Sequence, residues 1–114
     1  TAPIFFALGI IFSLVLFPEP ANYASVVILT FGDGFATIFG KKFGKTVIPF
    51  NKGKRLEGTL FGFAFAFLGA LIFVNHVKAL IGAFIGMLVE LLPLPINDNL
   101  TIPLVTGLTL TLIP

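Results

Sequence analysis

The sequence contains no cysteine, a single histidine and few charged residues, and each shortage excludes a class of function. Without cysteine, the chain has no disulfide framework, no thiolate nucleophile and no cysteine-ligated metal. The one histidine, His76, excludes a metal centre built from several histidines. Charged residues make up 11% of the 114 residues, whereas soluble domains carry about 25%. A water-soluble domain could not cover its surface with so few charges.

Hydrophobic residues make up 57% of the chain and fall into five apolar stretches. These stretches cover residues 3–17, 23–39, 57–74, 77–92 and 100–113. Apolar and polar residues do not alternate within them, so we expect helices rather than strands. At about 1.5 Å per residue, such helices reach roughly 21–27 Å, a little less than a bilayer core of about 30 Å. The sequence therefore predicts an all-α, polytopic integral membrane bundle of about five transmembrane helices, forming one domain over residues 1–114.

The two ends of the sequence suggest that more chain lies beyond them. The chain begins at Thr1 without a methionine, and it ends at Pro114 within an apolar run. Its first stretch has neither a basic leader nor a small-residue cleavage site, so it does not resemble a signal peptide. We expect the sequence to be part of a longer chain.

Positive charge is concentrated in one loop, residues 40–56, which holds six of the seven basic residues. They are Lys41, Lys42, Lys45, Lys52, Lys54 and Arg55. The positive-inside rule places this loop on the cytoplasmic face. Because successive helices alternate in direction, the turn at residues 93–99 returns to the same face and brings Asp98 with it. Cations beside carboxylates at a membrane surface predict a nucleotide or phosphate site that serves a lipid-soluble substrate.

Asp33, a carboxylate inside an apolar stretch, is the first candidate for chemistry. Facing lipid, it would cost about 2.5–3.5 kcal/mol, so it requires a partner or a wet cavity. The flanking residues Gly32 and Gly34 leave room for a ligand or a metal to approach the backbone. A structural ion pair with a lysine of the basic loop is the alternative.

The segment Gly40-Lys41-Lys42-Phe43-Gly44-Lys45-Thr46 invites comparison with a phosphate-binding P-loop. That motif requires a glycine where this chain has Phe39, and no strand is expected before the segment, so we exclude a P-loop NTPase. Two glycines and three lysines can still offer amides and positive charge to phosphate. The alternative is a basic anchor that touches only lipid headgroups.

Two further carboxylates lie at expected helix starts. Glu57 follows the last cations of the basic loop, and it either caps its helix or ligates a divalent cation. Asp98 stands between Asn97 and Asn99. Either Asp98 or Asn99 is the N-cap of the last helix, or these oxygen-bearing side chains bind Mg²⁺.

Small residues recur every four positions in three rows, which predicts close packing between helices. The rows are Gly32, Ala36, Gly40, Gly44, then Gly58, Gly62, Ala66, Ala70, and then Gly82, Gly86. In lipid, helices associate through such close contacts because hydrophobic burial no longer drives them together.

Three motifs in order resemble the CTP-dependent lipid-alcohol kinases, a family that includes dolichol kinase, phytol kinase and the CTP-dependent diacylglycerol kinase of fungi. They are Gly32-Asp33-Gly34-Phe35-Ala36 with Gly40 and Gly44-Lys45, then Lys54-Arg55-Leu56-Glu57-Gly58-Thr59, and then Asp98-Asn99-Leu100-Thr101-Ile102-Pro103-Leu104. Together they cover roughly residues 30–110. The family commonly has a serine or threonine where this chain reads Lys54-Arg55-Leu56, so a hydroxyl contact to nucleotide is not expected there.

The resemblance implies phosphoryl transfer from CTP to the hydroxyl of a polyprenol, phytol or diacylglycerol-type lipid at the cytoplasmic face. It implies that Asp33, Asp98 and Glu57 are catalytic and hold Mg²⁺. The nucleotide-binding residues that it implies are Lys41, Lys42, Lys45, Lys52, Lys54, Arg55, Gly34, Gly40, Gly44 and Asn99. The expected partners are a bilayer lipid and a nucleoside triphosphate, without nucleic acid, and a homo-oligomer is compatible with the sequence.

Three rival functions remain as alternatives. A cytidylyltransferase that makes a CDP-activated lipid is more distantly similar, but its terminal His-Gly-Gly and Asp-Arg-hydrophobic-Asp signatures are absent. A small ion-coupled transporter would use Asp33, Glu90 and Asp98 as an ion path, yet no internal repeat supports it. A structural subunit anchored by its basic loop leaves Asp33 unexplained.

Overall fold

The computed structural model describes residues 2–93 and 97–113, and most of them are helical. Four helices are α1 (Ala2–Leu16), α4 (Leu56–Ala70), α5 (His76–Leu91) and α6 (Asp98–Leu112). Between α1 and α4, one continuous rod consists of α2 (Ala21–Val27), a π-helical turn (Ile28–Asp33) and α3 (Gly34–Phe43). Residues 94–96, inside the turn expected at 93–99, lie outside the described residues, as do residues 1 and 114.

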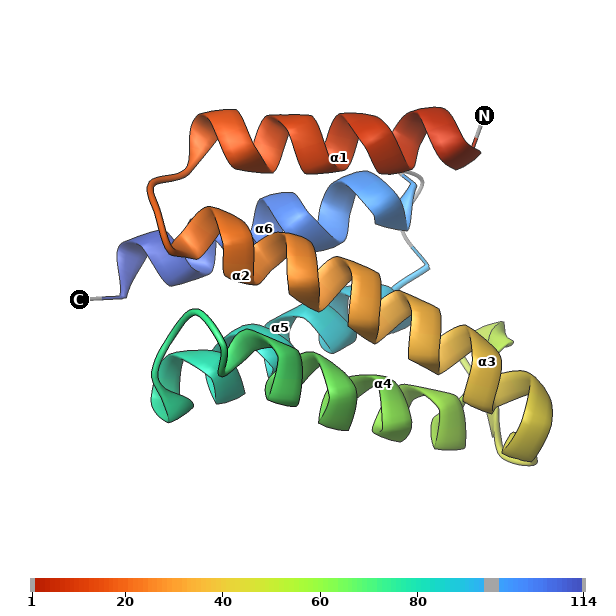
Figure 1. Ribbon diagram of the computed structural model, residues 1–114. Helices are drawn as coiled ribbons and strands as arrows, with labels where there is room; N and C mark the ends of the chain where they lie inside the picture. The colour runs from red at the N-terminus through yellow and green to blue at the C-terminus, as the bar shows by residue number, and fades with distance from the viewer. Residues whose placement is uncertain (1, 94–96, 114) are drawn as a thin grey trace.

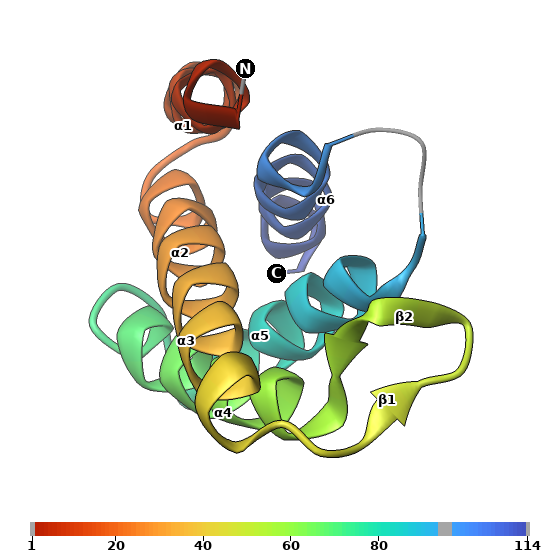
Figure 2. The ribbon, with the colours of Figure 1, turned by 90° about the vertical axis from the view of Figure 1, so that its right-hand side faces the viewer.

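Within the described residues, five helical rods run alternately in opposite directions (Figure 1). Helix α1 packs on α2 and α6, and α4 packs on α3 and α5 (Figure 2). The predicted helical stretches and their alternation are confirmed. The second rod continues to Phe43 rather than ending at residue 39, so Gly40, Lys41 and Lys42 lie on a helix and not in a loop.

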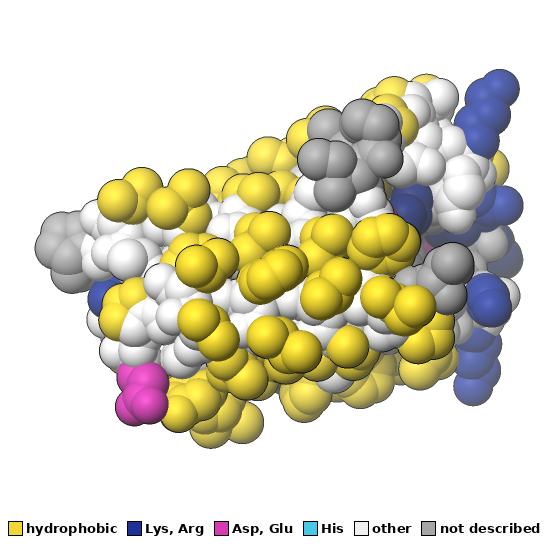
Figure 3. Space-filling model, turned by 90° about the horizontal axis from the view of Figure 1, so that it is seen from above, with side chains coloured by type: hydrophobic (Ala, Val, Ile, Leu, Met, Phe, Trp, Pro, Cys, Tyr) yellow, Lys and Arg dark blue, Asp and Glu magenta, His cyan; other side chains and the backbone are white. Residues whose placement is uncertain are grey.

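One helical rod matches the length and apolar character of a membrane-spanning helix better than the others do. Among the described residues, one helix, Ala21–Phe43, has both the length and the hydropathy needed to cross a membrane. The helices Pro3–Leu16 and Leu56–Ala70 are apolar but shorter. Only 33% of the most apolar window of the long helix is buried inside the molecule. Figure 3 shows most Lys and Arg side chains gathered at one end and apolar side chains along the length of the molecule.

The basic loop contains a small β-hairpin that the all-α prediction did not include. Strand β1 (Val47–Ile48) pairs antiparallel with β2 (Asn51–Arg55). The sequence Asn-Lys-Gly-Lys-Arg of β2 has low strand propensity, so composition gives no sign of it. Tertiary contact stabilises it instead, because the Asn51 Nδ2 donates a hydrogen bond of 3.1 Å to the Leu91 carbonyl at the end of α5.

Two of the predicted small-residue rows pack against each other between α3 and α4. A methyl group added at Gly58 would lie 2.7 Å from the Gly40 Cα, and one at Gly62 would lie 2.9 Å from the Ala36 Cβ. Both distances are too short for a carbon–carbon contact, so the glycines set how closely these helices approach. The contact between the two rows of small residues therefore sets the position of α3 relative to α4.

Candidate active site

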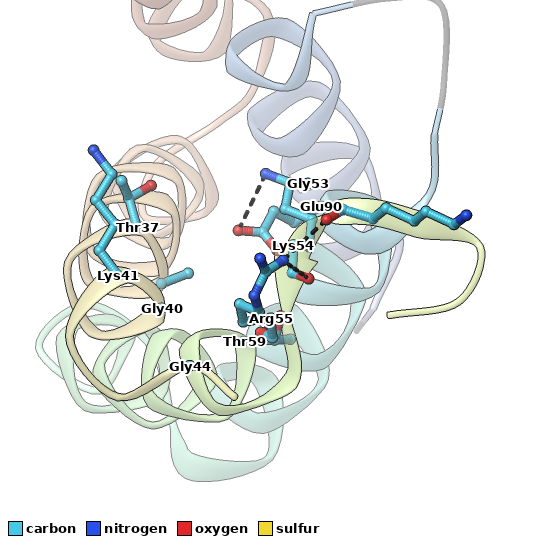
Figure 4. A pocket seen from close by; sticks show the side chains of 11 residues that line it. Thr37, Gly40, Lys41, Gly44, Gly53, Lys54, Arg55, Thr59 and Glu90 are labelled. Carbon is cyan, nitrogen blue, oxygen red and sulfur yellow. Dashed lines mark hydrogen bonds and ion pairs between the residues drawn. The ribbon is translucent and has the colours of Figure 1, made fainter. Parts of the chain in front are cut away.

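A cleft of about 340 Å³ opens at the hairpin end of the bundle. Its walls come from α3, β2, the start of α4 and the end of α5, and Figure 4 shows Lys41 and Thr37 facing Lys54, Arg55 and Glu90. The lining residues are Ala36, Thr37, Gly40, Lys41, Gly44, Lys52, Gly53, Lys54, Arg55, Thr59 and Glu90. Four of them are cations, so the cleft suits a polyvalent anion.

Lys54 joins the acidic residues at this cleft. Its Nζ lies 3.4 Å from Asp98 Oδ2 and 3.7 Å from Glu90 Oε2, and Figure 4 marks the pair with Glu90. Asp33 is close enough to interact electrostatically with Lys54 and Asp98, and Glu90 interacts with all three. The fold thus places Asp33 and Asp98 within electrostatic range of each other and of Lys54, although neither aspartate lines the cleft itself.

Local structure explains why Asp33 is accessible. It ends the π-helical turn of the long rod, and such turns occur frequently at functional sites. A methyl group added at the next residue, Gly34, would meet nothing within 4 Å. Open space therefore lies beside the half-buried Asp33 on the Gly34 side, as predicted, but not at Gly32, where an added methyl group would lie 2.8 Å from the Met87 Sδ.

The start of α6 positions Asp98. The N-cap is Asn97, whose Oδ1 accepts a hydrogen bond of 2.9 Å from the Asn99 amide. The predicted caps, Asp98 and Asn99, are therefore wrong by one or two residues. Because Asn97 caps the helix, the carboxylate of Asp98 pairs with Lys54 instead.

Glu57 has its bonding partners in the loop rather than at Lys54. Its Oε1 accepts hydrogen bonds of 3.0 Å from the amides of Lys45 and Thr46, and its Oε2 accepts one of 2.7 Å from the Thr46 hydroxyl. The side chain lies over the loop, outside the apolar part of α4. Its amide and hydroxyl bonds to Thr46 are the main reason that the pKa of Glu57 is lowered to about 2.

The predicted nucleotide-binding residues separate into two groups. Lys41, Lys52, Lys54, Arg55, Gly40 and Gly44 line the cleft, whereas Gly34, Lys42, Lys45 and Asn99 do not. The Lys42 Nζ lies instead over the Phe43 ring, 5.5 Å from its centre. Asn99 is the second residue of α6, close to Asp98.

Arg55 is held in place by its neighbours at the cleft. Its guanidinium donates hydrogen bonds of 2.9 Å and 3.2 Å to the carbonyls of Lys52 and Lys54. A methyl group at Gly44 would lie 2.6 Å from the Arg55 Cγ, so glycine is needed for this approach. The guanidinium is therefore positioned before any ligand arrives.

The sequence places Glu90 near the same face as Asp98, about two helical turns before it, but assigns it a role only in the rival ion path. Glu90 is 1% exposed, lines the cleft, and its Oε1 has no hydrogen-bond partner among the described residues. The signal was present in the sequence, because Glu90 is an acidic residue within an apolar stretch, as Asp33 is.

Metal binding depends on the arrangement of the acidic side chains across the part of the chain that the structure describes. Within residues 2–93 and 97–113, no three acidic or histidine side chains lie close enough together to hold a metal ion. Mg²⁺ often binds through only one or two carboxylates, with phosphate and water oxygens as its other ligands. The unpartnered Glu90 Oε1 and the nearby Asp98 therefore suit a cation that arrives with a phosphate.

These features define a class of protein, an apolar helical bundle with a cation-lined cleft and clustered carboxylates at one end. No family model and no solved structure matches the sequence. The chain is 30% identical to phytol kinase 1, chloroplastic, of Arabidopsis thaliana, over 91% of this chain and 40% of that protein. It is 31% identical to probable phytol kinase 1, chloroplastic, of Glycine max, over 91% and 41%. It is 29% identical to farnesol kinase, chloroplastic, of Arabidopsis thaliana, over 93% and 40%.

Over most of its own length, the chain is therefore similar to proteins named phytol kinase and farnesol kinase. It spans about two fifths of the length of these curated relatives. This similarity supports the lipid-alcohol kinase family to which the three sequence motifs pointed.

Proposed function

We propose that this chain forms the active site of a kinase that transfers the terminal phosphoryl group of CTP to the hydroxyl of a lipid alcohol. The products would be a lipid phosphate and CDP. The observation that carries the proposal is the meeting of Asp98 and Glu90 at Lys54, with Asp33 nearby, beside a cleft that Lys54 and Glu90 line together with further cations. The relatives are named for phytol and farnesol, which makes an isoprenoid alcohol the first substrate to test.

The triphosphate would lie among the cations of the cleft. The volume of the cleft, about 340 Å³, falls within the usual range of ligand pockets, about 300–1,000 Å³. Lys41, Lys52, Lys54 and Arg55 would neutralise the phosphates, and Gly40 and Gly44 would allow close approach to the backbone. Four of the predicted residues lie outside the lining. Lys42 and Lys45 would act through their positive electrostatic potential, whereas Gly34 and Asn99 would reach the nucleotide through small movements. The choice of CTP rests on the resemblance of the three motifs.

The carboxylates would hold the metal and move the proton. In this proposal Asp33 and Asp98 would hold Mg²⁺, which would supply positive charge to the phosphates, and one of the two aspartates would accept the proton of the lipid hydroxyl. Glu57 could join them only by giving up its hydrogen bonds to Lys45 and Thr46. Positioning and charge stabilisation would supply most of the catalysis in such a reaction.

The lipid would reach the cleft from the bilayer. The proposal treats the five rods as membrane-embedded, with the basic end on the cytoplasmic side, as the positive-inside rule requires. Figure 3 supports this arrangement, because on the face in view the charged side chains lie at the ends of the molecule and the hydrophobic side chains lie between them. The hydroxyl would stop at the cleft while the apolar tail stays among the helices.

The test is an assay of the chain in detergent or vesicles with labelled CTP and phytol, farnesol, a polyprenol or diacylglycerol. Loss of a catalytic proton acceptor typically costs about 10²–10⁴-fold in rate, so Asp33→Asn and Asp98→Asn should lose most turnover. Glu19→Gln is the matched control, because Glu19 bonds Tyr23 at the opposite end of the bundle. Full turnover in both aspartate variants would refute the proposal, and pyrophosphate in place of CDP would favour a cytidylyltransferase.

A further inference from the structure

Glu90 is a buried carboxylate to which the proposed reaction has so far given no role. It lies in the last turn of α5 (His76–Leu91) and lines the cleft. Its Oε2 faces Lys54, whereas its Oε1 is buried and has no hydrogen-bond partner within the described part of the chain. A buried carboxylate oxygen has lost its water without replacement, which is unfavourable unless a ligand compensates it.

Lys54 Nζ marks the point at which Glu90 and Asp98 meet. The Glu90 Oε2 lies 3.7 Å from this nitrogen and the Asp98 Oδ2 lies 3.4 Å from it. Asp33 interacts with the same charges. When ionised, these three carboxylates carry three negative charges, of which the single ammonium among them neutralises one and a divalent cation would neutralise two.

We propose that a divalent cation takes the place of Lys54 Nζ, with Glu90 rather than Asp33 joining Asp98 as its protein ligand. Asp33 then remains to accept the hydroxyl proton, while Lys54 turns to the nucleotide phosphates. This inference rests on the proposed function, because the phosphates complete the coordination of the cation. Oxygens bind Mg²⁺ at about 2.0–2.1 Å, so Asp98 has to move inward by about 1.3–1.4 Å and Glu90 by about 1.6–1.7 Å. Lysine suits the exchange, since its ammonium is a point charge on a flexible stem that binds phosphate well.

The alternative third carboxylate, Glu57, is less suited to this place. Both of its oxygens already accept hydrogen bonds from Lys45 and Thr46, and no ion pair joins it to Lys54 among the described residues. Glu90 has one oxygen without a partner and the other beside Lys54. The structure therefore assigns the cation to Glu90.

The exchange couples the binding of the cation to the binding of the nucleotide. Without nucleotide, Lys54 competes with the cation for the same carboxylates. Once phosphates attract Lys54, the cation binds more tightly, and by reciprocity the cation also tightens nucleotide binding. The site would then favour the cation–nucleotide complex over either ligand alone.

Mn²⁺ binding to the full chain in detergent, followed by electron paramagnetic resonance, tests this directly. It is measured with and without the non-transferable analogue cytidine β,γ-methylene triphosphate. Glu90→Gln should weaken Mn²⁺ binding by about tenfold or more, as loss of groups around metals does. Lys54→Met should bind Mn²⁺ more tightly than the natural chain without analogue and should bind the analogue more weakly. Glu19→Gln should change neither affinity.

Two results would overturn the inference. If the Glu90→Gln variant binds Mn²⁺ as tightly as the natural chain, Glu90 is not a ligand of the cation. If the Lys54→Met variant gains no Mn²⁺ affinity, Lys54 and the cation do not exchange places. If Glu90→Gln does not fold, Glu90→Asp takes its place and should also bind Mn²⁺ more weakly.

The inference and the proposed function fail in different ways. A natural chain without kinase activity whose Mn²⁺ binding still depends on Glu90 would contradict only the function. An active kinase whose Mn²⁺ binding ignores Glu90 would contradict only the inference.

Discussion

Thr46 donates two hydrogen bonds to Glu57, from its amide to Oε1 at 3.0 Å and from its hydroxyl to Oε2 at 2.7 Å. The Lys45 amide adds a third bond at 3.0 Å. These bonds tie the segment that follows α3 to the first turn of α4. They therefore shape the rim of the cleft, where Gly44 and Arg55 are in close contact.

Removing the Thr46 hydroxyl should shift the titration of Glu57. Because its pKa is lowered to about 2 from the ordinary 4.5, the carboxylate stabilises the loop fully above pH 4.5. That stabilisation is lost as the pH falls from 4.5 toward 2. In Thr46→Val the midpoint should rise, as measured by carbon-13 NMR of the Glu57 carboxyl. The control is Thr109→Val, because the Thr109 hydroxyl donates a hydrogen bond to the Val105 carbonyl in α6, far from Glu57; this change should leave the midpoint unchanged. A midpoint near 4.5 for Glu57 in the unmutated chain would contradict the interpretation.

Lys41 and Lys42 are adjacent in sequence but should differ in their effect on nucleotide binding. Lys41 lines the cleft, whereas Lys42 lies over the Phe43 ring. Lys41→Met should raise the KM for CTP about tenfold, which corresponds to ~1.4 kcal/mol. Lys42→Met should have a clearly smaller effect. Equal changes in the two variants would mean that only the general positive potential matters.

The packing of α3 on α4 should make two glycines respond oppositely to alanine. At Gly58 the added methyl would lie 2.7 Å from the Gly40 Cα, whereas at Gly34 it would meet nothing within 4 Å. Overpacking costs about 1–3 kcal/mol, so Gly58→Ala should lower the free energy of unfolding. Gly34→Ala should be neutral or stabilise by up to ~1 kcal/mol, since alanine favours helix. Unfolding in detergent measures both, and a stable Gly58→Ala would refute the contact.

The proposed membrane orientation can be tested with single cysteines, because the chain has none of its own. Lys52 lies in β2 at the cleft end, and His76 begins α5 at the other end (Figure 1). In sealed vesicles, an impermeant maleimide should label Lys52→Cys and His76→Cys from opposite sides. Labelling of both from the same side would exclude the multi-pass arrangement.

The order and approximate bounds of the helices follow from the sequence because long apolar stretches leave few alternatives. Alternating direction then places Asp98 at the end that holds the basic loop, and the ion pair with Lys54 agrees with that placement. The small-residue rows likewise predicted the contact of α3 with α4, since a missing side chain is visible in the sequence. The hairpin was missed because polar β2 carries no periodic pattern.

Which acids share the cleft was decided only by the tertiary structure. In sequence, Glu57 stands two residues from Arg55 and Glu90 stands far from every cation of the loop. In the fold, Glu57 bonds the loop while Glu90 reaches Lys54. The reason is geometric, because one residue of offset turns a side chain by about 100° around a helix. The packing of the rods, and not the spacing of residues along the chain, sets that rotation.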